Sequence, residues 1–187
     1  MQKCYYIFSK INKHKILIVN IENPKMSNTI QAIAFFDTPK KIKGRVLFTE
    51  NNSKNTVQID IQLTGLKPGL HGFHVHETGD LSQGCDSLCA HFNPTNKQHG
   101  GLHSKERHVG DLGNITADKN GICQMQLEDA QIKLRGSKYN ILGRGLIIHE
   151  DPDDLGQGTN EASKINGNAG KRIACAIIGY ASKCNKK

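Results

Sequence analysis

Residues 56–63 read Thr-Val-Gln-Ile-Asp-Ile-Gln-Leu, in which polar and apolar side chains alternate without a break. Alternation with a period of two puts one face of a β-strand against a core and the other face toward solvent. This stretch therefore predicts a half-buried β-strand.

Six further segments carry the same signature of alternating or β-branched residues. They are residues 30–36, 45–49, 72–76, 121–127, 145–149 and 173–180. Turn-forming residues separate the strands at 38–39, 50–55, 67–69 and 118–121. Because the 187-residue chain also has 19 glycines, no tryptophan and few long apolar runs, we expect one all-β domain, a sandwich or barrel.

Two long segments interrupt the strands, residues 77–111 and 150–172, and both are rich in Gly, Asn, Asp and Ser. Loops of this length inside a compact domain are usually functional or disordered. Four potential metal ligands lie in the first segment, which favours a function.

The formal charge of +8 is uneven, since residues 1–25 contain five lysines and one glutamate. The other basic residues are scattered and lack aromatic interleaving, so we expect no nucleic-acid partner. The apolar run 16–19 is too short to span a membrane and lacks a signal-peptide cleavage pattern. We therefore predict a cytoplasmic protein with no membrane contact, in which 1–25 is a dispensable basic extension and 26–187 is the domain.

His74 and His76 lie two residues apart on a predicted strand, so their imidazoles share one face and can share one metal. An isolated pair of this kind is equally compatible with two surface histidines. The neighbourhood favours a metal site, because five more donors follow: His91, His99, His108, Asp111 and His149.

The seven donors can be divided into two sets of different chemistry. Three imidazoles with one carboxylate suit a closed tetrahedral zinc site, and four imidazoles suit tetragonal Cu(II). The first set is His91, His99, His108 and Asp111; the second is His74, His76, His91 and His149. Counting His91 twice requires an imidazolate with one ring nitrogen on each metal, a sharing that the residues alone leave open.

Five ordered motifs carry a resemblance to a known family. They read Gly-Leu-His-Gly-Phe-His-Val-His-Glu at 69–77, His-Phe-Asn-Pro at 91–94, His-Gly-Gly at 99–101, Arg-His-Val-Gly-Asp-Leu-Gly-Asn at 107–114 and Gly-Asn-Ala-Gly at 167–170. From about residue 30 to residue 181 the chain resembles the copper,zinc superoxide dismutases. The resemblance implies an eight-stranded Greek-key β-barrel whose two long segments are a metal loop and an electrostatic loop.

The resemblance also implies an activity and its cofactors. Copper would be held by His74, His76, His91 and His149, and zinc by His91, His99, His108 and Asp111. Superoxide, the substrate, would be dismutated to oxygen and hydrogen peroxide as copper is alternately reduced and oxidised. Zinc would hold and tune the bridging imidazole of His91, which together with Arg172 forms the catalytic pair.

Two further roles follow from the resemblance, and each has a simpler alternative. Arg172 matches an anion-guiding guanidinium, although it could serve only to anchor its loop. Asp153 matches a carboxylate that joins a copper histidine to a zinc histidine, although Asp-Pro-Asp-Asp is also turn chemistry. Asp151, Ala162 and Ile165 stand where animal members commonly have basic, acidic and basic residues, which weakens the expected steering.

Six cysteines are present, and a cytoplasmic protein usually keeps its thiols reduced. The family is an exception, and its intrasubunit disulfide matches Cys85 and Cys175. Cys89 has no counterpart in the family. We interpret it as a free loop thiol; mispairing with Cys175 and capture of metal are the alternatives.

Family resemblance also indicates how the chain assembles and acquires its copper. It implies a homodimer that uses the first strand, the region of Gly79, Leu142-Gly143 and the C-terminal strand. The absence of proline in 172–175 looks compatible with copper loading without a dedicated chaperone. A noncatalytic copper-delivery module on the same fold is the main alternative function, but such modules add Cys-x-x-Cys or Cys-x-Cys motifs, and this chain has neither.

Overall fold

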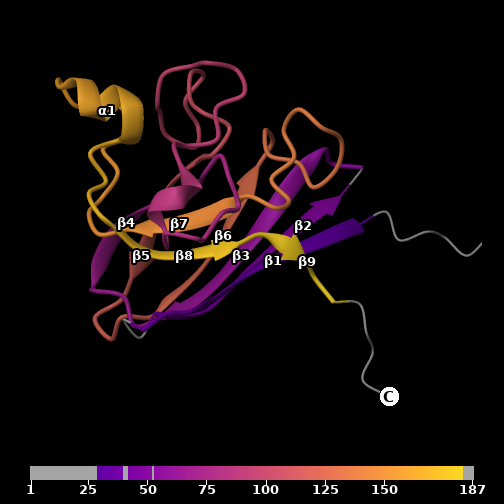
Figure 1. Ribbon diagram of the computed structural model, residues 1–187, viewed down its shortest axis with the longest axis horizontal. Coiled ribbons are helices and arrows are strands. Elements are labelled where there is room, and N and C mark those ends of the chain that lie inside the picture. Colours follow the sequence, from indigo (N-terminus) through magenta and orange to yellow (C-terminus); the bar gives the residue numbers. More distant parts are fainter. Residues whose placement is uncertain (1–28, 40–41, 52, 183–187) are drawn as a thin grey trace, which may run out of the picture.

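The computed structural model describes residues 29–39, 42–51 and 53–182. Within these ranges the chain forms eight strands of five or more residues and the two-residue strand β9 (Figure 1). The expected all-β class and the eight strands are thus confirmed. The strands are β1 Thr29–Asp37, β2 Lys43–Asn51, β3 Thr56–Thr64, β4 Gly69–Val75, β5 Asp111–Ala117, β6 Cys123–Asp129, β7 Gly145–His149, β8 Arg172–Ile177 and β9 Gly179–Tyr180.

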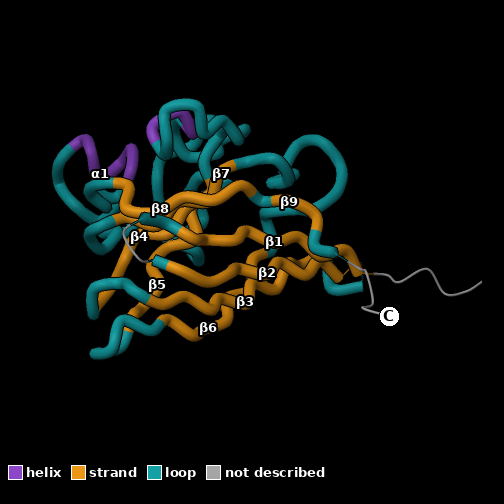
Figure 2. The backbone as a smooth tube through the Cα atoms, turned by 60° about the horizontal axis from the view of Figure 1, so that its bottom comes forward, coloured by secondary structure: helices purple, strands orange, loops and turns teal. Residues whose placement is uncertain are grey.

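The strands form two antiparallel sheets that pack into a sandwich (Figure 2). One sheet has the order β6-β3-β2-β1-β9 and the other has the order β5-β4-β7-β8. The chain crosses between the sheets after β3, β5, β6 and β8, and β6 returns to pair with β3. These crossings between the sheets give the Greek-key arrangement.

The core fills the space between the two sheets. On β3 the apolar side chains of Val57, Ile59, Ile61 and Leu63 are at most 1% exposed, whereas Gln58 and Gln62 face solvent. Burial of this face is the main source of sheet stability, because each fully buried aliphatic side chain contributes about 1.5 to 3 kcal/mol. The alternation in 56–63 is therefore confirmed as a core-facing pattern.

Two features differ from the expected strands. β5 (Asp111–Ala117) lies where no strand was predicted, because its polar-apolar alternation is confined to the four residues 114–117. The predicted strand 173–180 is divided at Ile178, where the chain leaves the sheet of β8 and joins β1 through β9.

The two long segments lie on the same side of the sheet that contains β4 and β7 (Figures 1 and 2). The first carries the short 3-10 helix η1 (Asp86–Leu88), and the second carries the helix α1 (Glu161–Asn166), which the sequence pattern did not reveal. A third long connection, residues 130–144, joins β6 to β7. No helix in these described ranges is long and apolar enough to cross a membrane.

Several contacts fasten the loop between β4 and β5 to the sheet, among them a disulfide and a buried leucine. A disulfide joins Cys85 to Cys175 on β8, as predicted. Leu88 is fully buried beside Gly145 on β7. A Cβ atom added at Gly145 would lie only 2.4 Å from the Cδ1 atom of Leu88. The predicted extension 1–25 lies outside the described residues, as do Cys4 and Cys184.

Candidate metal centre

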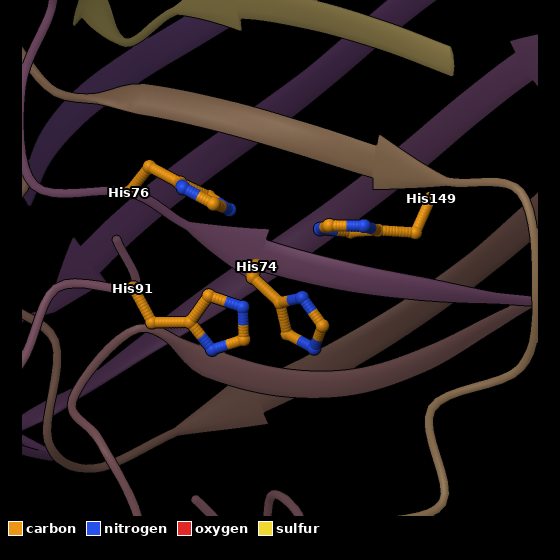
Figure 3. Close-up of side chains that lie close together, drawn as sticks. All are labelled: His74, His76, His91 and His149. Carbon is orange, nitrogen blue, oxygen red and sulfur yellow. The ribbon is translucent and has the colours of Figure 1, made fainter. Parts of the chain in front are cut away.

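Four imidazoles converge beside the end of β4 (Figure 3). His74 lies on β4 and His149 ends β7, while His76 forms an isolated bridge with His91 of the long loop. All four side chains are buried. The strand register therefore brings together donors that lie up to 75 residues apart in the sequence.

Each of these rings uses one nitrogen in a hydrogen bond and leaves the other without a partner. His76 Nδ1 donates to Cys89 O at 2.8 Å and His149 Nδ1 donates to Gly170 O at 3.2 Å. Since a carbonyl oxygen can only accept, the opposite nitrogen of a neutral ring carries a free lone pair. The unpartnered buried nitrogens are His74 Nδ1, His76 Nε2, His91 Nε2 and His149 Nε2.

A second cluster lies immediately beside the first, where three imidazoles surround one carboxylate oxygen. The Nδ1 atoms of His91, His99 and His108 lie 2.9, 3.0 and 3.1 Å from Asp111 Oδ1. The other oxygen, Oδ2, accepts hydrogen bonds from the backbone amides of Gly100 and His108, at 3.1 and 2.8 Å. The carboxylate is thus fixed in the centre of the three rings.

His91 belongs to both clusters through opposite sides of one ring. Its Nδ1 faces Asp111, while its Nε2 is among the unpartnered atoms of the first cluster. The donor atoms of each cluster lie within 4.8 Å of one another. One imidazole therefore separates two groups of four donors.

The atoms present fit the two metals that these donor sets suit. A tetrahedral ion with bonds of about 2.0 to 2.1 Å holds its donors roughly 3.3 Å apart, close to the spacing around Asp111. The first cluster offers four nitrogens with free lone pairs, a donor set that suits Cu(II). Buried lone pairs without partners are costly, so a bound cation would satisfy groups that the protein leaves unpaired.

The Asp153 carboxylate links the two clusters by hydrogen bonds. Its Oδ2 accepts from His74 Nε2 and its Oδ1 accepts from His99 Nε2, each at 2.8 Å. A glycine is needed at Gly167, because its φ is +67° and a Cβ atom there would lie 1.9 Å from Asp153 Oδ1. The end of α1 thereby leaves room for this carboxylate.

Burial keeps the rings of the first cluster neutral. Desolvation, with the neighbouring rings, lowers the pKa of His74 to about 3 and that of His149 to about 4. The same causes lower the pKa of His76 and of His91. Four neutral imidazoles are the form that binds a metal at neutral pH.

The carboxylates give the second cluster the opposite character. Burial opposes ionisation of Asp111, but hydrogen bonds from His108, His91 and His99 outweigh it and hold the pKa of Asp111 well below its usual range. Burial also opposes charge on His99, yet Asp111 and Asp153 raise its pKa to about 9. In Asp153 the bonds from the two histidines outweigh burial and lower the pKa to about 2. This cluster therefore favours a positive charge among its rings.

A hollow of about 340 Å³ leads to the first cluster, with His76, His91 and His149 in its lining. Arg172 lines it as well, and its guanidinium donates to Cys85 O at 2.7 Å, Asp86 O at 3.2 Å and Cys89 O at 2.5 Å. Arg172 is thus anchored to the long loop, and it also lies in the lining of the hollow.

Two supporting residues were missed in the sequence. Asn114 exchanges two hydrogen bonds with the backbone of Asp153, at 2.8 and 2.7 Å, and so positions the carboxylate between the histidines. Arg107 is 2% exposed, forms an ion pair with Asp129 and donates to Asp111 O at 2.6 Å. Both residues belong to the motif at 107–114, and their closeness to His108 and Asp111 in that motif is the sequence feature that could have identified them.

The fold and the donor atoms define a β-sandwich protein with two adjacent metal-ligand sets that share one histidine. The profile of the family described as copper/zinc superoxide dismutase matches residues 42–178. The chain therefore belongs to the copper/zinc superoxide dismutase family, a family of oxidoreductases that bind copper and zinc.

Three comparisons show how close the likeness is. A Cu-Zn superoxide dismutase of Paramecium bursaria Chlorella virus 1 is 54% identical over 165 residues, 88% of this chain and 86% of the viral protein. An extracellular Cu-Zn superoxide dismutase of Drosophila melanogaster is 50% identical over 155 residues, 80% of this chain and 85% of the fly protein. The crystal structure of the clock protein EA4 matches with a TM-score of 0.78 at 43% identity, and covers 85% of this chain and 99% of that one.

Proposed function

We propose that this protein dismutates two superoxide anions, with two protons, to oxygen and hydrogen peroxide. His91 carries the proposal, because its two ring nitrogens face two donor sets of different chemistry. We assign copper to His74, His76, His91 and His149, and zinc to His91, His99, His108 and Asp111. Bound copper supplies a site that takes an electron from one superoxide and gives it to the next.

The protein's own residues prepare this chemistry in three ways. Asp153 fixes the orientation of His74 and His99 by accepting from both rings. His91 lines the hollow, and its unpartnered Nε2 could hold a proton for the peroxide whenever it is not bound to copper. Arg172 places a permanently charged guanidinium in the lining of the hollow, which favours entry of a small anion.

Metal analysis combined with kinetics tests the proposal. The purified protein should contain copper and zinc, lose its dismutation activity on chelation and regain it when copper is added back. His76→Gln should abolish that recovery, because it removes one of four copper ligands, whereas His103→Gln, at an exposed histidine, should not. Bound copper without dismutation would overturn the proposal and favour the copper-delivery module.

A homodimer belongs to the same proposal. The four segments expected at its interface adjoin one another: β1 pairs with β9, Gly143 N donates to Ile178 O at 2.8 Å, and Gly79 packs directly on Gly143. Tyr180, 72% exposed, projects from this region. Such a contiguous area suits an interface with a second copy.

Three further parts of the proposal concern the whole protein. Residues 26–187 form the domain, the protein works in the cytoplasm, and copper loading needs no dedicated chaperone. Expression of 26–187 in cells that lack a copper chaperone, followed by cell fractionation and copper analysis, tests them together. Recovery of copper enzyme only when a chaperone is present would refute the third.

A further inference from the structure

Cys89 is an exposed free thiol in the lining of the hollow that leads to the four-imidazole cluster. The same hollow is lined by His76, His91 and His149, whose Nε2 atoms are buried and have no hydrogen-bond partner. An exposed residue with a free thiol therefore lines the same hollow as three histidines whose Nε2 atoms have no hydrogen-bond partner.

The backbone of Cys89 ties this thiol to the cluster. Its carbonyl oxygen accepts from His76 Nδ1 at 2.8 Å and from Arg172 Nη2 at 2.5 Å, and His91 follows two residues later. Its Sγ makes a long hydrogen bond of 3.5 Å to Ser87 O. Cys89 is thus held beside the copper ligands while its sulfur keeps only a weak interaction.

We propose that Cys89 is an entry ligand for copper, which captures Cu(I) at the hollow and passes it to the histidines. The inference rests on the proposed copper site. A thiolate is a soft ligand that prefers Cu(I), the form in which copper is carried by thiols. On capture the Cys89 thiol gives its proton to solvent as the sulfur-copper bond forms; on transfer that bond breaks and the thiol regains a proton. Copper stays Cu(I) throughout, so no oxidant or reductant is needed.

The rate of Cu(I) uptake tests this step separately from enzyme activity. Full-length, copper-free protein carrying Cys4→Ser and Cys184→Ser removes the two tail thiols from the comparison. Anaerobic Cu(I) is offered as its coloured bicinchoninate complex, and uptake is followed as loss of colour in a stopped-flow instrument. Adding Cys89→Ser should slow uptake by about tenfold without changing the final one copper per chain, because a hydroxyl is a poor ligand for a soft cation.

Two matched variants control for folding and for thiols in general. Cys89 has a φ of +63°, which a glycine adopts without strain. Cys89→Gly therefore removes the thiol without straining the backbone, and its copper uptake should be as slow as that of Cys89→Ser. Cys123→Ser removes a buried thiol and should take up copper at the rate of the background protein. Non-reducing peptide mapping verifies that Cys85 and Cys175 remain paired.

X-ray absorption on early freeze-quenched samples supplies a second readout. Copper should have a sulfur neighbour in the background protein and none in Cys89→Ser. Equal uptake rates with no sulfur neighbour, at one copper per chain, would overturn the role of Cys89 and leave the copper site standing. Failure of every variant to bind copper would instead overturn the proposed function.

Discussion

His74 and His76 lie two residues apart, yet they turn different ring nitrogens toward the same cluster. His74 leaves Nδ1 free because its Nε2 donates to Asp153, and His76 leaves Nε2 free because its Nδ1 donates to Cys89 O. The donor atom of each histidine is therefore chosen by its hydrogen-bond partner. Replacing those partners should alter the metal centre without touching a ligand.

Asp153→Asn tests this dependence. An asparagine presents one oxygen and one amide group, so one of the two ring N–H groups of His74 and His99 would meet another donor. Copper affinity should fall by about 10- to 100-fold, measured by competition with a chelator. Asp154→Asn is the matched control, because the Asp154 carboxylate accepts from Ser163 and Asn168, neither of which belongs to the two ligand sets. Equal copper affinity in both variants would show that Asp153 is only a turn residue.

Arg172→Glu tests the guiding role of the guanidinium. Salt screens the attraction between a cation and an anionic substrate, so the activity of the unmodified enzyme should fall as ionic strength rises. In Arg172→Glu both the activity and its fall with salt should be sharply reduced. Lys119→Glu, in the exposed turn between β5 and β6, changes the net charge by the same amount and should retain both the activity and its decrease with salt. Unchanged kinetics in Arg172→Glu would leave it as an anchor alone.

Much of this centre could be predicted from residue types and spacing. The seven donors and their division into two sets follow from the histidines and Asp111. Which ring nitrogen of each histidine faces the cluster could not be predicted. It depends on hydrogen-bond partners such as Gly170 O and Cys89 O, which are backbone atoms that no sequence pattern marks. Asn114 and Arg107 escaped notice for a similar reason, since their contacts arise only when β5 forms.

At the scale of elements, the long loop from β4 to β5 depends on its docking to β7. Leu88 of η1 is fully buried against Gly145, and the atoms leave no room for a Cβ at that position. Cores tolerate neither a cavity nor an added methyl group without cost. The loop that carries His91, His99 and His108 should therefore be sensitive to this one contact.

A double-mutant cycle measures the contact between Leu88 and Gly145. Gly145→Ala should destabilise the protein by about 1 to 3 kcal/mol through overpacking, and Leu88→Ala by about 2 to 5 kcal/mol through a cavity. Since the alanine at 145 would enter that cavity, the double variant should be less destabilised than the sum of the two. Urea unfolding of the metal-free proteins provides the free energies. Strict additivity would mean that the two sites do not share a packing contact.

The elements that could be predicted share one physical property. β3 was predictable because one face is buried and the other is wet, so its sequence alternates. β5 was not, because its alternation covers only residues 114–117, and the six-residue helix α1 is too short to show a helical period. The sheet change at Ile178 is a property of the whole sandwich, which no local run encodes.

At the scale of the whole molecule, a single charge placed at the proposed dimer interface is a direct test of assembly. Tyr180→Glu introduces a charge on β9 at a side chain that is largely exposed in one subunit. Burying that charge between two copies would be unfavourable, so the dimer should dissociate at protein concentrations where the unmodified chain stays paired. Analytical ultracentrifugation measures the change, with Lys119→Glu as a control. A dimer of unchanged affinity would place the interface elsewhere.

The disulfide connects the metal loop to the far end of the chain, and its removal tests how the molecule is held together. Cys85 and Cys175 are 90 residues apart, so the cross-link limits a long loop in the unfolded chain. In the chain-entropy model this contributes at most about 4 to 5 kcal/mol to the free energy of unfolding. Cys85→Ser with Cys175→Ser should lower that free energy accordingly in urea titrations at fixed protein concentration, whereas Cys89→Ser should not.

Cys85→Ser with Cys175→Ser should also affect the hollow that Arg172 lines. Arg172 donates to the carbonyl oxygens of Cys85 and Cys89, so a loop released from β8 would no longer fix the guanidinium. We therefore expect the double serine variant to lose activity beyond any loss of copper, with a weaker dependence on salt. If copper content, activity and salt dependence all survive, the packing of Leu88 against Gly145 and the hydrogen bonds of Arg172 hold the loop without the disulfide. Combining Leu88→Ala with the serine pair would then release it.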